Sequence, residues 1–255
     1  MTFLQVPKKM AWKYNLSQTY TSTKSILITS GCSFTASTQQ LESAASWPGY
    51  VRDRCKFNYC IDYSYPGAGN EYIGDSILHY FSEIDNTSDY FVIIMWSGID
   101  RKEEKIKGLS QQPMIGDVSY QRTKYQVSDK LRCQYANESA NKIFELYNYL
   151  TKRNISFVFT SYVNLLFPPY ISKRDTTTEF DRLVGSEILS KLKSLPWIPA
   201  KPMDYLYEYS FVNDYLTTGD YFHPPVECNL SWTDNVLLPG LDKQGLIAKC
   251  NTKAR

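Results

Sequence analysis

The distribution of apolar and polar residues predicts four strands. Residues 25–30 (SILITS) read as a short buried strand, and residues 57–64 (FNYCIDYS) alternate apolar and polar side chains as a half-buried strand does. The most apolar run is 90–96 (YFVIIMW), which is continuous, as in a central parallel strand covered on both faces. A fourth strand is predicted at 155–161 (ISFVFTS).

Apolar residues at helical spacing predict two helices between these strands. One begins near Asn70 and presents a stripe of Ile73, Ile77, Tyr80, Phe81 and Ile84. The other leads into the last strand and has the stripe Ala136, Ala140, Ile143, Phe144, Tyr147 and Leu150. Alternating strands and helices predict an α/β fold, a three-layer α/β/α sandwich with a mainly parallel central sheet. At 255 residues, one domain (1–255) is the expectation.

Two stretches interrupt the alternation and are read as insertions. Residues 101–130 are polar and mixed in charge, and residues 167–219 contain a helix predicted near 178–194 and the aromatic run MDYLYEYSF. Both begin just after the carboxyl end of a predicted strand, the edge at which open α/β sheets bind ligands. They therefore form the walls of a site or, alternatively, packing and assembly surfaces.

Composition excludes several classes of protein. Hydrophobic residues make up 43% and charged residues 21%, which argues against disordered, collagen-like and coiled-coil chains. A net charge of +2 argues against a nucleic-acid partner. No apolar run approaches the ~20 residues of a membrane helix, and residues 1–15 lack the apolar stretch of a signal peptide. We therefore expect no membrane association and no export by a standard signal.

Cysteine and histidine are distributed in a way that indicates no metal site. The six cysteines form no C-x-x-C pair, and neither of the two histidines lies close to a cysteine pair. We expect reduced thiols, no bound metal and no cofactor. Aromatic residues reach 15%, a content that suits core packing and interfaces first and sugar stacking second.

The two histidines differ in their surroundings. His79 shares a helix face with Asp75 and Glu83 at i, i+4 spacing, which indicates a solvated surface. His223 lies in the constrained segment GDYFHPP, three residues after Asp220. A carboxylate in that position can fix the tautomer of the imidazole and stabilise its protonated form, so that the ring acts as a general base.

Ser33 is the candidate nucleophile. It follows the strand 25–30 in a glycine-containing turn that we expect to open a helix, where backbone N–H groups can face a developing anion. A serine in a turn more often has a turn or capping role, so Ser33 by itself is weak evidence. Cys32 is an alternative nucleophile, but its side chain is expected to point away from that of Ser33.

Three segments, in order, resemble the sequence blocks of the SGNH (GDSL-type) hydrolases. GCSFTAS resembles the first block, with Cys32 where an Asp is usual and Ser33 as the nucleophile. YSYPGAGNEYI resembles the second block, whose glycine N–H joins the oxyanion hole, here Gly67. GDYFHPP is similar to the last block, which implies that Asp220 and His223 complete a Ser-His-Asp triad. The resemblance spans residues 25–240, including a closing helix that ends NLSWTDNVLLPGL.

The third block departs from the family pattern. Where the family has Gly-x-Asn-Asp after the central strand, this chain has Ser97-Gly98-Ile99-Asp100. Ile99 cannot donate a hydrogen bond from its side chain, and the loss of one oxyanion donor costs about 100- to 1000-fold in turnover. The expected oxyanion hole therefore consists of the N–H groups of Ser33 and Gly67, with Ser97 or Asn70 as a replacement donor.

The resemblance implies a serine esterase that removes acyl groups from a carbohydrate or a small ester. An alternative is a virion or other assembly protein that uses the fold with weak or no catalysis, because similar SGNH-like proteins are encoded by tailed phages; its partners would then be proteins of that assembly. The expected location is accordingly the cytoplasm or a virion. A carbohydrate-binding module without chemistry is a third alternative.

Overall fold

A computed structural model describes most of the chain. It covers residues 19–36, 46–98, 128–166, 183–199, 201, 204–213, 215 and 224–250, and the backbone alone at 101–104 and 114–117. Outside the two backbone-only segments, side chains are described at every residue of these ranges except 19, 129, 211, 249 and 250.

The centre of the fold is a four-stranded parallel sheet. Its strands, in spatial order, are β3 (Tyr59–Asp62), β2 (Ile26–Ser30), β4 (Tyr90–Trp96) and β7 (Ser156–Ser161). All four predicted strands are confirmed, with the second shortened at both ends. Residues 91–96 of β4 are fully buried, as their continuous apolar pattern predicts.

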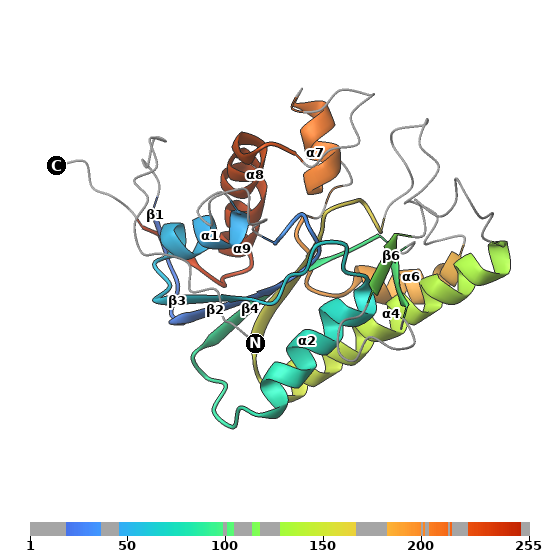
Figure 1. Cartoon of the computed structure of the whole chain (residues 1–255). Helices are drawn as coiled ribbons and strands as arrows, with labels where there is room; N and C mark the ends of the chain where they lie inside the picture. The colour runs from blue at the N-terminus through green and yellow to red at the C-terminus, as the bar shows by residue number, and fades with distance from the viewer. Residues whose placement is uncertain are drawn as a thin grey trace.

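Helices cover both faces of the sheet and complete the predicted three-layer sandwich (Figure 1). One face carries α2 (Asn70–Ser82), α4 (Asp129–Lys152) and α6 (Ser186–Lys193). The other face carries α1 (Trp47–Cys55), α8 (Val226–Trp232), a π-helical segment (Thr233–Leu237) and α9 (Leu238–Lys243), with α7 (Leu206–Val212) beside α8. No helix among the described residues is both long and apolar enough to span a membrane.

Short antiparallel pairs lie outside the central sheet. β1 (Thr19–Thr21) pairs with β8 (Ala248–Cys250), and β5 (Arg101–Glu104) pairs with β6 (Met114–Asp117). The insertion 101–130 thus contains a β-pair, and the insertion 167–219 contains α6 and α7. The helix predicted near 178–194 is found at 186–193, while residues 167–182 lie outside the described part.

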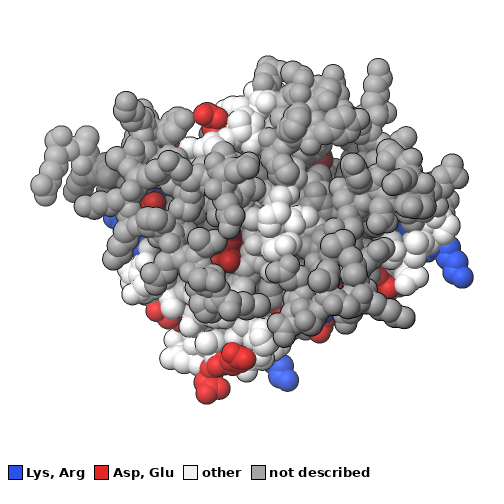
Figure 2. Space-filling model, viewed as in Figure 1, with Lys and Arg blue, Asp and Glu red and all other residues white. Residues whose placement is uncertain are grey.

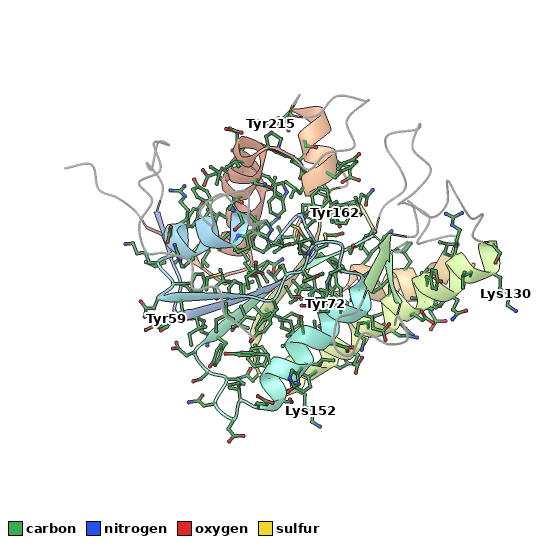
Figure 3. All side chains as sticks on the ribbon, in the orientation of Figure 1. Tyr59, Tyr72, Lys130, Lys152, Tyr162 and Tyr215 are labelled. Carbon is green, nitrogen blue, oxygen red and sulfur yellow. The ribbon has the colours of Figure 1, made fainter. Side chains whose placement is uncertain are left out.

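Aromatic side chains supply much of the core (Figure 3). Trp47 meets Trp232 edge to face between α1 and α8, and Trp96 meets Phe159 in the same geometry between β4 and β7. Because large rings dominate these contacts, the aromatic content serves packing, as predicted. His79 is exposed, which confirms the solvated helix face.

On the face shown in Figure 2, the described acidic and basic side chains lie singly or in small groups. The five cysteines whose side chains are described are unpaired: Cys32, Cys55, Cys60, Cys133 and Cys228.

Candidate active site

Ser33 lies in a tight turn at the carboxyl end of β2. The N–H groups of Thr35 and Ala36 both donate to the carbonyl of Cys32, at 2.9 Å each, and close a single helical turn. Ser33 is half-buried, whereas Cys32 is fully buried in the core. The two side chains therefore have different surroundings, as the strand geometry predicts, and residues 37–45 lie outside the described part.

Gly31 is needed for the close packing of this turn. A Cβ atom at this position would lie 2.2 Å from the Thr35 Oγ1 and 3.1 Å from the Met95 carbonyl oxygen. Any side chain would therefore push the turn away from the sheet. This steric requirement explains the glycine directly before the Cys32-Ser33 pair.

We expect Gly31→Ala to destabilise the protein by about 1–3 kcal/mol, the usual cost of adding atoms to a packed site. Urea unfolding measures this loss. Gly245 provides the matched control for an exposed site, because nothing lies within 4 Å of a Cβ built there. Its backbone has a φ of +70°, so Gly245→Asn, a residue that tolerates this conformation, is the suitable substitution. Equal unfolding midpoints for wild type and Gly31→Ala would contradict the packing argument.

Aromatic contacts of Phe34 join the Ser33 turn to neighbouring segments. The ring of Phe34, the residue after Ser33, stacks on Tyr162 with centroids 4.2 Å apart and an interplanar angle of 14°. Tyr162 follows β7 directly, and Figure 3 labels it at this end of the sheet. Tyr207 meets the same Phe34 ring edge to face at 6.3 Å. The Ser33 turn is thereby joined to the segment after β7 and to α7.

The loop that carries Gly67 lies against the Ser33 turn. The Tyr65 N–H donates to the Gly31 carbonyl at 3.0 Å, and the Ala68 N–H donates to the Tyr65 carbonyl at 3.0 Å. Gly67 has a φ of +83°, a conformation that glycine adopts at no steric cost. The hydrogen bond to Gly31 thus brings together the segments that supply the two predicted backbone donors, Ser33 and Gly67.

Asn70 and Ser97 are directly bonded to each other. The Asn70 Oδ1 accepts the Ser97 N–H at 2.8 Å, and the Asn70 Nδ2 donates to the Ser97 carbonyl and to the Ser139 Oγ, both at 3.2 Å. Asn70 and Ser97 are both buried, and the Ser97 Oγ has no hydrogen-bond partner among the described residues. The Asn70 amide therefore fixes the backbone at the end of β4, and the Ser97 hydroxyl retains its hydrogen-bonding capacity.

The predicted acid–base pair lies outside the described residues. Asp220 and His223 fall in the range 216–223, and Ile99 falls at 99–100, so their positions relative to Ser33 stay predictions. The described chain resumes directly after His223, where Pro224 is buried and Pro225 is the N-cap of α8.

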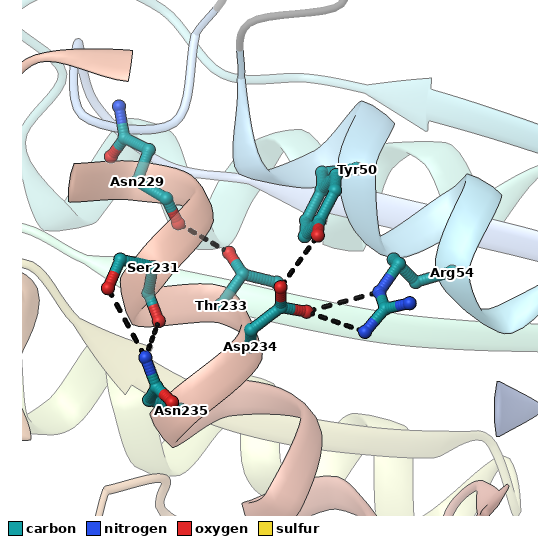
Figure 4. A network of polar contacts seen from close by, with 7 residues as sticks. All are labelled: Tyr50, Arg54, Asn229, Ser231, Thr233, Asp234 and Asn235. Atoms are coloured by element: carbon teal, nitrogen blue, oxygen red, sulfur yellow. Dashed lines mark hydrogen bonds and ion pairs between the residues drawn. The ribbon is translucent and has the colours of Figure 1, made fainter. Parts of the chain in front are cut away.

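The closing helix is fastened to α1 by a polar network (Figure 4). Asp234, in the π-helical segment, accepts from the Tyr50 hydroxyl at 2.7 Å and from the Arg54 guanidinium at 3.1 and 2.9 Å. On the same segment the Thr233 hydroxyl donates to the Asn229 carbonyl at 2.8 Å. The network thereby anchors the helix that begins three residues after His223.

Sequence reasoning did not single out Glu208 and Tyr162, two residues that support this site. Glu208 is buried in α7, and its Oε1 accepts the Asn164 N–H at 2.9 Å. Burial raises the pKa of its carboxyl group to about 8. The run MDYLYEYSF contains two acidic residues, Asp204 and Glu208. The position of Glu208 between two tyrosines was the available signal for a buried carboxyl group.

Several solved structures share this fold. The crystal structure of TesA has a TM-score of 0.50 and 12% identity, covering 86% of this chain and 98% of that chain. The psychrotrophic esterase EstA from Pseudoalteromonas sp., in a structure inhibited by monoethylphosphonate, has a TM-score of 0.50 and 12% identity, with coverages of 87% and 98%. The acetyl xylan esterase AlAXEase has a TM-score of 0.50 and 13% identity, with coverages of 82% and 96%. No family model matches the sequence, and the search of curated proteins found no match.

The parallel sheet with helices on both faces, the SGNH α/β/α architecture, is what this chain shares with these structures. The chain therefore has the SGNH hydrolase fold, as its sequence blocks predict. A likeness at this level of identity concerns the fold, and the chemistry has to be argued from the residues of this chain.

Proposed function

We propose that this protein is an acyl hydrolase in which Ser33 attacks an ester carbonyl. The observation that carries the proposal is the placement of the Ser33 turn. It lies at the carboxyl edge of a parallel sheet and is hydrogen-bonded to the Gly67 loop through Tyr65 and Gly31. Ligands bind at that edge in open α/β folds, and the esterases with the same architecture support the same use of it.

In the proposed reaction, His223 accepts the proton of the Ser33 hydroxyl while Oγ attacks the carbonyl carbon, and Asp220 orients the imidazole. Collapse of the tetrahedral intermediate breaks the bond to the leaving alkoxide, which takes the proton from His223. Water then attacks the acyl-enzyme, again with His223 as base, and releases the acid and Ser33.

The oxyanion would be stabilised by the N–H groups of Ser33 and Gly67, with the Ser97 hydroxyl as a third donor. Two facts support Ser97: its buried Oγ has no partner among the residues that the structure describes, and the Asn70 amide holds its backbone by two hydrogen bonds. Both hydrogens of the Asn70 amide are engaged, with Ser97 and Ser139. Asn70 is therefore assigned a positioning role and Ser97 the role of the donor.

The proposed substrates are acyl esters, including acylated carbohydrates. One of the esterases of this fold is an acetyl xylan esterase. In this chain, Tyr65 is 42% exposed two residues before Gly67, and its ring lies 5.9 Å from that of Tyr72. The exposed Tyr65 ring, beside the oxyanion loop, would suit the apolar face of a sugar.

The proposal is tested by labelling with a fluorophosphonate, a reagent that phosphonylates activated serines. We expect one equivalent of label, located on Ser33 by peptide mass spectrometry, and no label after Ser33→Ala or His223→Ala. Label on another residue would refute the assignment of Ser33. Complete absence of labelling, with an intact fold, would favour the alternative of an assembly protein built on this fold.

A further inference from the structure

One carboxyl group is buried where α7 meets the loop after β7. The Glu208 side chain accepts the Asn164 N–H through Oε1 at 2.9 Å, and its buried Oε2 has no hydrogen-bond partner in the part of the chain that the structure describes. Burial is the main cause that raises the pKa of Glu208 to about 8. A carboxyl group in such surroundings is retained as the neutral acid at pH 7.

The described segments around α7 contain no basic residue that could stabilise a Glu208 anion. Residues 162–166, 204–213 and 224–232 include no Lys, Arg or His. Their titratable groups are two further carboxyls, one thiol and the tyrosines, namely Asp204, Glu227, Cys228, Tyr162, Tyr205, Tyr207 and Tyr209. Burial raises the pKa of the Cys228 thiol to about 12, and burial with the nearby Glu208 raises that of Tyr205. Among these described segments, no positive charge is therefore present to compensate an ionised Glu208.

Glu208 and its neighbour Tyr207 fix the loop after β7 at two points. Glu208 accepts from Asn164, and the Tyr207 N–H donates to the Tyr162 carbonyl at 2.7 Å. Tyr162 in turn stacks on Phe34, the residue after Ser33. A continuous series of contacts thus runs from the buried acid to the turn with the candidate nucleophile.

We propose that Glu208 is a positioning residue for the Ser33 turn, and that it acts as a neutral acid which holds the loop 162–164 in place. Ionisation of Glu208 loosens α7 from this loop and weakens the stack of Tyr162 on Phe34. The expected effect of this loosening on catalysis rests on the proposed function of Ser33. The mechanical coupling between Glu208 and residues 31–36 is independent of that function.

The sign of the pH effect follows from proton binding. The ordinary pKa of a glutamate is 4.5, and in the folded protein that of Glu208 is about 8. The stability that the neutral acid contributes is full below about pH 4.5, declines as the unfolded chain ionises, and is lost above about pH 8. Glu208→Gln keeps a carbonyl oxygen to accept the Asn164 N–H and cannot ionise, so it removes this decline.

The experiment compares wild type, Glu208→Gln and the control Glu83→Gln, which makes the same change at an exposed residue at the end of α2. Urea unfolding midpoints are measured from pH 5 to 9. Hydrogen exchange of residues 31–36 and 162–166 is measured at pH 7 and pH 9 and corrected for the intrinsic rate. We expect wild type and Glu83→Gln to lose stability relative to Glu208→Gln as the pH rises. In wild type and Glu83→Gln, we also expect residues 31–36 and 162–166 to lose protection from hydrogen exchange at pH 9. In Glu208→Gln, both segments should retain that protection.

A pH-independent difference in stability between wild type and Glu208→Gln would overturn the titration of Glu208. Loss of protection at 162–166 alone, with 31–36 unchanged, would overturn the coupling to Ser33.

With 4-nitrophenyl acetate as substrate, we expect the kcat/KM of wild type to fall above about pH 8, by up to ~10-fold per pH unit, and that of Glu208→Gln to stay level. If no variant hydrolyses the ester, the proposed function fails, and the exchange data still decide the coupling.

Discussion

Replacing Ser33 by alanine is expected to lower kcat/KM for 4-nitrophenyl acetate at least about 1000-fold, because the acyl-enzyme can no longer form. The fold should be unaffected, since Ser33 is half-buried and the turn around it is closed by backbone bonds to Cys32. Steady-state kinetics measure the loss, and circular dichroism verifies the fold. The wild-type rate itself is expected to be modest, because Ile99 replaces the usual asparagine donor.

Two control variants make this result specific. Ser82→Ala makes the same substitution at an exposed serine at the end of α2 and should keep the wild-type rate. Cys32→Ala removes the buried neighbouring thiol and should keep most of the activity, since the thiol lies in the core. A Ser33→Ala variant as active as wild type would refute the nucleophile, and inactivation by Cys32→Ala alone would move the chemistry to the thiol.

Replacing Asp234 by alanine is expected to cause a large loss of stability, about 2–3 kcal/mol. The Arg54 side chain is only 6% exposed, and its guanidinium and the Tyr50 hydroxyl both bond to this carboxylate (Figure 4). Removing one partner of a buried ion pair lowers the free energy of unfolding by about 3–5 kcal/mol. Removing one partner of an exposed ion pair lowers it by about 0–1 kcal/mol. Asp234 is 33% exposed, which places the expected value between these limits.

Chemical unfolding measures the effect of Asp234→Ala against two comparisons. Asp85→Ala, at an exposed carboxylate in the turn after α2, should change stability by less than about 0.5 kcal/mol. Tyr50→Phe removes only the hydroxyl bond and should cost about 1 kcal/mol. An Asp234→Ala variant as stable as Asp85→Ala would show that the network does not fasten α8 to α1.

Much of the fold could be predicted from the sequence because its strands and helices are strongly patterned. The run 90–96 is apolar throughout and is indeed a strand between two others, and the stripe that begins at Ile73 marks the buried face of α2. The insertions were harder to predict. Residues 101–104 (RKEE) are all charged, and residues 114–117 (MIGD) are too short a segment to show the alternation of a strand. Within the described part of the chain the two segments pair with each other, outside the central sheet.

The candidate site was predictable only where a motif carries its geometry. The turn after β2 and the glycine loop could be identified because Gly31 and Gly67 occupy positions that restrict other residues. The role of Asn70 could not be read from the sequence. Its amide could equally donate to a substrate or bond to the protein, and the bonds to Ser97 and Ser139 became evident only when α2, β4 and α4 were placed together.

The sequence by itself determined the layers of this protein and the residues that are candidates for chemistry, because local periodicity and short motifs encode them directly. Tertiary structure alone decided how the Ser33 turn is held. The stack of Phe34 on Tyr162 joins residues 128 positions apart in the numbering, and the bond from Asn164 to Glu208 joins residues 44 apart. Such contacts depend on which strand ends lie next to each other. The burial that raises the pKa of Glu208 exists only once α7 has packed against α8 and the loop after β7.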